Sequence, residues 1–166
     1  AITVTLQDEI DISRGDLLVA PDAPTAVSKR VLAHVVWMAE SPLTTGRLYD
    51  IKLATKKTQG LFSSIRHRID VNSLEQHDAS ELKLNEIGLV ELDLTSAVGV
   101  DPYTQVRDTG SFIVIDRLSN VTIGAGMVVE ALADTVETKQ AFSEFELEFN
   151  ALVRKHFPHW LALDIS

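Results

Sequence analysis

The residue types that most often carry chemistry are present in this chain of 166 residues, but their spacing assembles no familiar reactive site. The clearest candidate is Gly124-Ala125-Gly126, which could form half of a nucleotide-binding glycine loop. Such a loop holds phosphate where a strand runs through the glycines into a helix whose first amides face the anion. Here the apolar residues 127–129 continue the strand pattern. We therefore expect the glycines to mark a bend or a close backbone approach inside a strand.

The other reactive residue types are no better arranged. The five histidines are scattered, and Pro158 interrupts the close pair His156 and His159, so no metal site is expected. No serine lies in a G-x-S-x-G frame. The carboxylates of residues 144–148 follow the solvated face of a predicted helix. The residues alone therefore predict no catalytic centre, no cofactor site and no metal site in this chain.

Composition sets the broad class of protein. A hydrophobic share of 45% and a charged share of 23% are ordinary for a folded soluble protein. A net charge of −9 argues against a nucleic-acid binder held by general attraction to phosphate. No apolar run approaches the roughly 20 residues that span a bilayer, the first residues lack the pattern of a signal peptide, and cysteine is absent. These features favour a cytoplasmic protein without membrane contact.

Positive charge is concentrated in one segment. Residues 47–68 hold six basic side chains and one acidic one, a net charge of +5, whereas the rest of the chain carries −14. We call these side chains the basic stripe: Arg47, Lys52, Lys56, Lys57, Arg66 and Arg68. The pattern is typical of two solvated strand faces, and the alternative is a docking stripe for an acidic partner surface or for RNA.

Hydrophobic patterning predicts β-structure between residues 31 and 130. Segments rich in β-branched and aromatic residues recur at short intervals with no helical pattern between them. In one of them Val90, Leu92 and Leu94 share a face. Residues 117–120 join two other segments as a hairpin. The fold that we expect is mainly β, with one small, closed, antiparallel barrel of about six strands.

The segments on either side of this barrel differ from it. Residues 1–20 begin with an alternation of apolar and polar side chains from Ile2 to Leu6, typical of a half-buried strand. Residues 21–30 contain two prolines and few large apolar side chains, which indicates a linker. Residues 131–166 are typical of a polar connector followed by an amphipathic helix, whose capping box begins at Ser143.

The predicted C-terminal helix carries a row of aromatic side chains that could anchor a partner. Aromatic and arginine side chains are enriched at the energetic centres of interfaces. The alternative is that the helix folds back onto its own barrel. The candidate contact residues of the helix and of the HFPHW string that follows it are Phe145, Phe149, Leu152, Arg154, Phe157 and Trp160, with Phe157 and Trp160 as the anchors. Those of the basic stripe are Arg47, Lys56, Lys57, Arg66 and Arg68.

Several longer strings point to a known family. They are RGDLLV, VVWMAE, YDIK, RIDVNSLE, LNEIGLVELDL, TGSFIVIDRLSNVTIGAGMV and ELEFNALVRKHFPHW. In this order they resemble the large, GTPase subunit of bacterial sulfate adenylyltransferase over nearly the whole chain. The string FIVIDRLSNVTIGAGMV is also similar to the end of the third domain of elongation factor Tu, as expected within the translation-factor GTPases.

This resemblance implies a division of the chain. The whole subunit would have a GTPase domain followed by two β-barrels. Residues 1–20 would end the second barrel, 21–30 would be a linker, 31–130 would form the third barrel, and 131–166 would be the connector and C-terminal helix. The two glycines would then lie in the last strand of the third barrel.

The resemblance also implies a function. In that family the small subunit makes adenosine 5'-phosphosulfate and pyrophosphate from ATP and sulfate, and the GTPase subunit couples GTP hydrolysis to this step. GTP and Mg2+ would bind the whole subunit at residues outside this chain. The family's motifs for phosphate, magnesium and guanine have no counterpart here. The implied partners are the small subunit and the GTPase domain of the same chain. An RNA-binding barrel, as in elongation factor Tu with tRNA, is the alternative, which the overall acidity disfavours.

Overall fold

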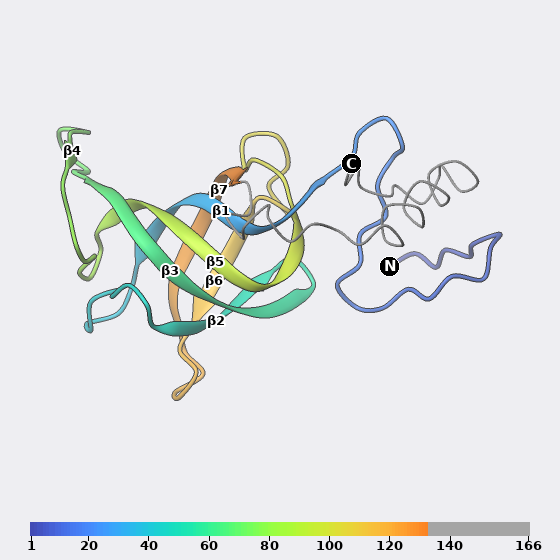
Figure 1. Cartoon of the computed structure of the whole chain (residues 1–166), viewed down its shortest axis with the longest axis horizontal. Helices are drawn as coiled ribbons and strands as arrows, with labels where there is room; N and C mark the ends of the chain where they lie inside the picture. Colours follow the sequence, from blue (N-terminus) through green and yellow to red (C-terminus); the bar gives the residue numbers. More distant parts are fainter. Residues whose placement is uncertain (133–166) are drawn as a thin grey trace, which may run out of the picture.

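The structure is a computed structural model of the chain, and it describes residues 1–132. Within this range the chain forms seven strands and no helix (Figure 1). The strands are β1 (Ala26–Trp37), β2 (Leu48–Leu53), β3 (Lys56–Ile69), β4 (Gln76–His77), β5 (Ile87–Val100), β6 (Ser111–Ile115) and β7 (Thr122–Leu132).

Six of these strands close into a barrel. Their hydrogen-bonded order is β2-β6-β7-β1-β5-β3, and β2 also pairs with β3, which completes the ring. All the pairs are antiparallel. The two-residue strand β4 pairs with the end of β3, outside the ring, and Figure 1 shows this extension projecting from one end of the barrel. The closed antiparallel barrel expected from the sequence is confirmed, and closure leaves none of its six strands with an open edge.

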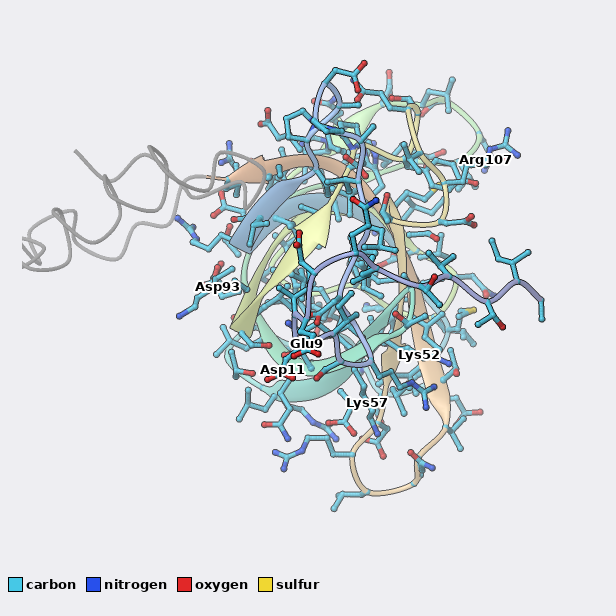
Figure 2. All side chains as sticks on the ribbon, turned by 90° about the vertical axis from the view of Figure 1, so that its right-hand side faces the viewer. Glu9, Asp11, Lys52, Lys57, Asp93 and Arg107 are labelled. Atoms are coloured by element: carbon cyan, nitrogen blue, oxygen red, sulfur yellow. The ribbon has the colours of Figure 1, made fainter. Side chains whose placement is uncertain are left out.

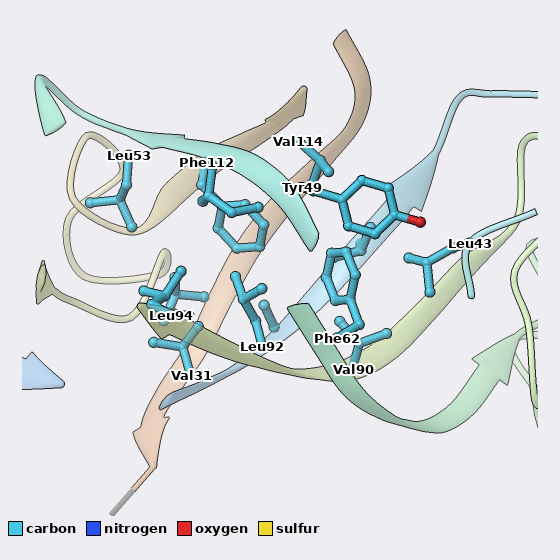
Figure 3. Close-up of a cluster of buried hydrophobic side chains, with 14 of the residues drawn as sticks. Val31, Leu43, Tyr49, Leu53, Phe62, Val90, Leu92, Leu94, Phe112 and Val114 are labelled. Carbon is cyan, nitrogen blue, oxygen red and sulfur yellow. The ribbon is translucent and has the colours of Figure 1, made fainter. Parts of the chain in front are cut away.

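The core fills the inside of the barrel with buried residues from each of the six strands of the ring. Val90, Leu92 and Leu94 of β5 are all buried, as their shared face predicts. The Tyr49 ring packs edge-on against Trp37, with ring centroids 5.6 Å apart, and lies tilted against Phe62 at 5.7 Å. Such aromatic pairs contribute about 0.5–1.5 kcal/mol beyond the burial of their area. Figure 3 shows Tyr49 and Phe62 beside the aliphatic side chains that complete this core.

The two glycines of the candidate loop have a structural role in β7. The strand passes through both and continues to Leu132, with β1 and β6 on its two sides. A Cβ added to Gly126 would collide with the ring of Phe112 on β6, and one on Gly124 would lie 3.3 Å from the Trp37 ring. The prediction of a close approach inside a strand is therefore confirmed.

A short hairpin joins β6 to β7, as predicted. The Asp116 carboxylate accepts hydrogen bonds from the Ser119 amide at 2.9 Å and from the Ser119 hydroxyl at 2.8 Å. Asn120 follows with a φ of 59°, a left-handed conformation that asparagine tolerates well. These side chains fix the turn, because each satisfies a local backbone requirement.

The first 25 residues contain no strand, so the half-buried strand predicted at residues 2–6 is wrong for this structure. Ile2 is 90% exposed, and Val4 and Leu6 are also exposed. Alternation alone does not make a strand, because a strand needs a neighbour for its hydrogen bonds and a surface for its apolar face. None of the described residues pairs with this segment.

The bounds of the barrel are also wider than the sequence predicts. β1 begins at Ala26, inside the predicted linker 21–30, because Ala26 to Ser28 pair with Val98 to Val100 at the far end of β5. β7 ends at Leu132, just inside the predicted connector. The rest of that connector and the predicted C-terminal helix lie outside the described residues.

Candidate functional site

The histidine and carboxylate side chains are dispersed in the part of the chain that the structure describes. Among residues 1–132, no group of three or more histidine and carboxylate side chains is placed to hold a metal ion. The same residues include no helix of the length and apolarity needed to cross a membrane. His34 on β1 and His67 on β3 lie on either side of β5, and each is in register with Leu89 of that strand. Burial, together with the charge of His67, lowers the pKa of His34, which favours its neutral form.

Charges on the outer surface of β1, β3 and β5 are matched to one another, and we call this surface the charge-paired face. Arg30 on β1 contacts Glu91 at 2.7 Å and Asp93 at 2.9 Å, both on β5. Arg66 on β3 donates to the other oxygen of Glu91 at 2.7 Å. The register explains this, because Arg30 lies opposite Asp93 while Ser64, close to Arg66, lies opposite Glu91. Glu91 is thus held between two guanidinium groups.

Most of the basic stripe is engaged in the same way. Five of its six side chains have partners inside the barrel domain. The contacts are Arg47 to Asp116 at 2.9 Å, Lys57 to Asp50 at 3.0 Å, Arg68 to Glu86 at 2.7 Å, Arg66 to Glu91 at 2.7 Å, and the Lys56 ammonium to the Ala97 carbonyl at 2.8 Å. This arrangement is the one expected for solvated strand faces. A role of these residues in a docking stripe stays a prediction.

Two carboxylates of these pairs have lowered pKa values. The pKa of Asp116 is lowered first by the backbone amide of Ser119, then by its hydroxyl, and further by Arg47. Burial alone would raise the pKa of Glu86, but its bonds to the Lys83 amide and to Arg68 outweigh burial and lower it. Both groups therefore stay ionised beside their arginine partners, which favours persistent pairs.

A shallow groove of about 590 Å³ crosses another side of the barrel, and we call it the lateral groove. Its floor is a row of side chains in register across four strands: Val36 on β1, Ala125 on β7, Ile113 on β6 and Lys52 on β2. The loop between β5 and β6 forms one wall. That loop is attached to β7, because the Tyr103 amide donates to the Val128 carbonyl at 2.9 Å.

The lateral groove combines an apolar floor with two cations. Lys52 and Arg107 form no ion pair with any residue in the described range 1–132. The Arg107 guanidinium lies 6.0 Å from the centre of the Tyr103 ring, within cation–π range. Asp108 is the acid that lines the groove. Figure 2 shows Lys52 and Arg107 on one side of the barrel and Asp93 of the charge-paired face on the other.

Only part of this surface could be predicted from the sequence. Lys52 belongs to the basic stripe, whereas Tyr103 and Arg107 belong to no predicted site. A signal was present, since Ile113 and Ala125 occupy outward positions where a solvated strand usually carries polar side chains. The register between strands, which brings these positions together, is not visible in the sequence. The C-terminal candidates, from Phe145 to Trp160, lie outside the described residues.

The closed barrel is similar to the C-terminal domains of eEF1A-like GTPases. Residues 30–129 match the family described as GTP-eEF1A C-terminal domain-like, and the chain belongs to this family. The crystal structure of Sup35 complexed with GDP is similar with a TM-score of 0.61 and 19% identity, covering 67% of this chain and 27% of that chain. Sup35 complexed with GMPPNP gives a TM-score of 0.59 at 19% identity, over 69% of this chain and 28% of that chain. At this identity the likeness shows the fold.

Closer relatives are sulfate adenylyltransferase subunit 1 proteins. This chain is 77% identical over 166 residues to that of Tolumonas auensis and 65% identical to that of Aeromonas hydrophila. It is 60% identical over 167 aligned residues to that of Photobacterium profundum. Each alignment covers 100% of this chain and 35% of the relative, so the chain spans about a third of the length of these curated relatives. The resemblance to the large subunit of sulfate adenylyltransferase is confirmed.

Proposed function

We propose that this chain is a coupling and subunit-interaction module within the GTPase subunit of a cytoplasmic sulfate adenylyltransferase. The observation that carries this proposal is identity of up to 77% to subunit 1 relatives along its entire length. In the proposed enzyme, the small subunit forms adenosine 5'-phosphosulfate and pyrophosphate from ATP and sulfate. GTP hydrolysis elsewhere in the large subunit drives this unfavourable step.

The described residues do not fit a GTP or magnesium site. The glycines of β7 lie in a strand paired on both sides, so their amides form no phosphate cradle. No carboxylate cluster of the kind that holds a metal is present among residues 1–132. We propose that the contribution of this part of the chain is mechanical.

A closed barrel suits that mechanical role. Coupling requires an element whose two positions differ in their contacts with both sites. A ring of six paired strands moves as one body, so a displacement imposed at one face reaches the opposite face without loss. The outer faces are then the surfaces on which the small subunit and the GTPase domain act.

The contact residues that we propose for the small subunit are those identified from the sequence. In the basic stripe they are Arg47, Lys56, Lys57, Arg66 and Arg68, and in the C-terminal segment they are Phe145, Phe149, Leu152, Arg154, Phe157 and Trp160. The aromatic members would contribute most, because large rigid side chains dominate the binding energy of interfaces.

The test is association of the whole GTPase subunit with the small subunit. Replacing Phe145, Phe149 and Trp160 together by alanine is expected to raise the dissociation constant at least tenfold, since truncating an anchor residue typically costs more than 1 kcal/mol. Leu118→Ala is the control, because Leu118 is 91% exposed in the β6–β7 hairpin. Unchanged association of the triple variant would exclude the C-terminal anchor and leave the family assignment in place.

RNA binding is the second candidate function, supported by the basic stripe. Titration of the whole subunit with tRNA at two salt concentrations separates the two. Saturable binding with a steep salt dependence would favour RNA, because displaced counterions make such binding salt-sensitive. The net charge of −9 and the internal pairing of the stripe favour weak binding without saturation.

A further inference from the structure

We propose that the lateral groove is the docking site for a segment of the small subunit that combines apolar side chains with carboxylates. This inference rests on the proposed function and adds to it the place and the chemistry of one contact. It follows from three properties of the groove: its shape, its apolar floor and its two cations.

The shape distinguishes this face from the rest of the barrel surface. The loop between β5 and β6 stands against β7, fixed by the Tyr103 amide to the Val128 carbonyl and by the Val128 amide to the Gly110 carbonyl at 2.7 Å. The groove beside it has a volume of about 590 Å³. Pockets for small molecules have volumes of about 300–1,000 Å³, so the groove has room for a few side chains of one short segment.

The floor is apolar at positions that face outward. Ile113 of β6, Ala125 of β7 and Val36 of β1 lie in one row, and Met127 extends it. Met127 is 38% exposed, and a flexible methionine adapts its shape to a partner. On the charge-paired face, the equivalent outward positions hold ion pairs. An apolar floor gains free energy when a partner's apolar side chains exclude water from it.

The two cations define the charge of that partner. Lys52 and Arg107 have no carboxylate partner within residues 1–132, although the chain as a whole is acidic. Unpaired cations beside an apolar floor are complementary to carboxylates on an apolar segment. Arg107 already packs against Tyr103, and arginine–aromatic pairs recur at the centres of protein interfaces.

The same features favour a protein segment over RNA. Single-stranded RNA is held by several stacking aromatic rings and a continuous basic track. Of the two aromatic residues in the groove lining, Phe112 is buried, which leaves the ring of Tyr103 to stack on a base. Asp108 also lies in the lining, where it would repel a phosphate. An apolar floor adds nothing to the binding of a phosphate backbone.

The experiment measures the affinity of the whole GTPase subunit for the small subunit after changes confined to the groove. Lys52→Glu combined with Arg107→Glu is expected to raise the dissociation constant at least tenfold and to reduce its salt dependence. Met127→Asp is expected to act in the same direction through the floor. Each reversal is also made alone, and Lys83→Glu is the matched control for each single variant. It makes the same charge reversal at a side chain that is 67% exposed and lies outside the groove lining.

Each outcome decides one point. Loss of affinity in the groove variants, with unchanged thermal unfolding and a normal Lys83→Glu control, supports the proposal. Equal affinity of wild type and groove variants overturns it, and leaves the proposed function intact. No association even of the wild-type subunits contradicts the proposed function itself.

Two other occupants give distinct results. If the subunit's own C-terminal segment filled the groove, truncation after Leu132 would strengthen association in the wild type but not in the groove variants, which would overturn the proposal. If RNA were the occupant, the groove variants would lose affinity for tRNA and keep their affinity for the small subunit, which would also overturn it.

Discussion

On the charge-paired face, Arg30 and Arg66 share the carboxylate of Glu91, whereas across the barrel Lys52 and Arg107 have no carboxylate partner among the described residues. Both faces are built on outward side chains of the same ring of strands, and the loop between β5 and β6 adds Arg107 to the groove. The charge-paired face satisfies its charges internally, and the lateral groove leaves both its cations and its apolar floor available. The difference separates a surface that stabilises the fold from one suited to a partner.

The comparison also shows why counting charges is a poor guide to a binding surface. The basic stripe stands out in the sequence, yet most of its side chains are held by nearby acids. Arg107, outside the stripe, has no such partner in the described part of the chain. The availability of a charge for a partner therefore depends on which side chains lie opposite it across the strands.

The largest expected effect concerns the strand beneath the groove. Gly126→Ala should lower the free energy of unfolding by about 1–3 kcal/mol, because the added methyl group would overlap the buried ring of Phe112. Ala125→Ser, at the neighbouring position on the opposite side of the same strand, should change it by less than about 0.5 kcal/mol. Urea denaturation of both variants gives the measurement. Equal stability of the two would mean that the inward side of β7 is not tightly packed.

A smaller effect is expected at the centre of the charge-paired face. Glu91→Gln should lower the free energy of unfolding by about 1–2 kcal/mol, because it weakens charge-assisted hydrogen bonds from Arg30 and Arg66. Lys52→Gln, in the groove, should change it by less than about 0.5 kcal/mol. Chemical denaturation at one pH compares them. If Lys52→Gln were the more damaging change, the distinction between the two faces would fail.

The smallest effect concerns acid titration of the pair between Arg47 and Asp116. Because the folded pKa of Asp116 is lowered, its ionised form stabilises the fold above the ordinary value of 3.8, and this contribution is lost as the pH falls through the lowered pKa. Ser119→Ala should move the pKa back toward 3.8, since the hydroxyl bond is removed. Ser63→Ala should leave it unchanged. NMR titration of the Asp116 carboxyl carbon measures the pKa in both variants. An equal pKa in the two would show that the Ser119 hydroxyl does not stabilise the ionised form of Asp116.

Much of the barrel could be predicted because its strands carry local signals. The buried face of β5 follows from alternation at Val90, Leu92 and Leu94, and the hairpin after β6 follows from its turn residues. The role of the β7 glycines also followed, since no helix pattern comes after them. In each case the information lies within a few consecutive residues.

Features that depend on distant partners could not be predicted in this way. The early start of β1 at Ala26 depends on its pairing with Val100, far along the chain. The segment from Ile2 to Leu6 has a strand pattern but no partner strand in the described residues. The lateral groove depends on the register of four strands and on the position of a loop. Neither can be predicted from a short stretch of sequence.

The pairing of β2 with β3 has a consequence for how this domain opens. Six residue pairs, from Leu48 with Leu61 to Leu53 with Lys56, complete the circle. The ring has no edge strand that could separate by itself. We therefore expect the backbone amides of all six strands to exchange with solvent deuterium together, in a single cooperative opening of the barrel. Local opening is then confined to the projecting turns, and a force applied to any one strand is distributed over the whole barrel.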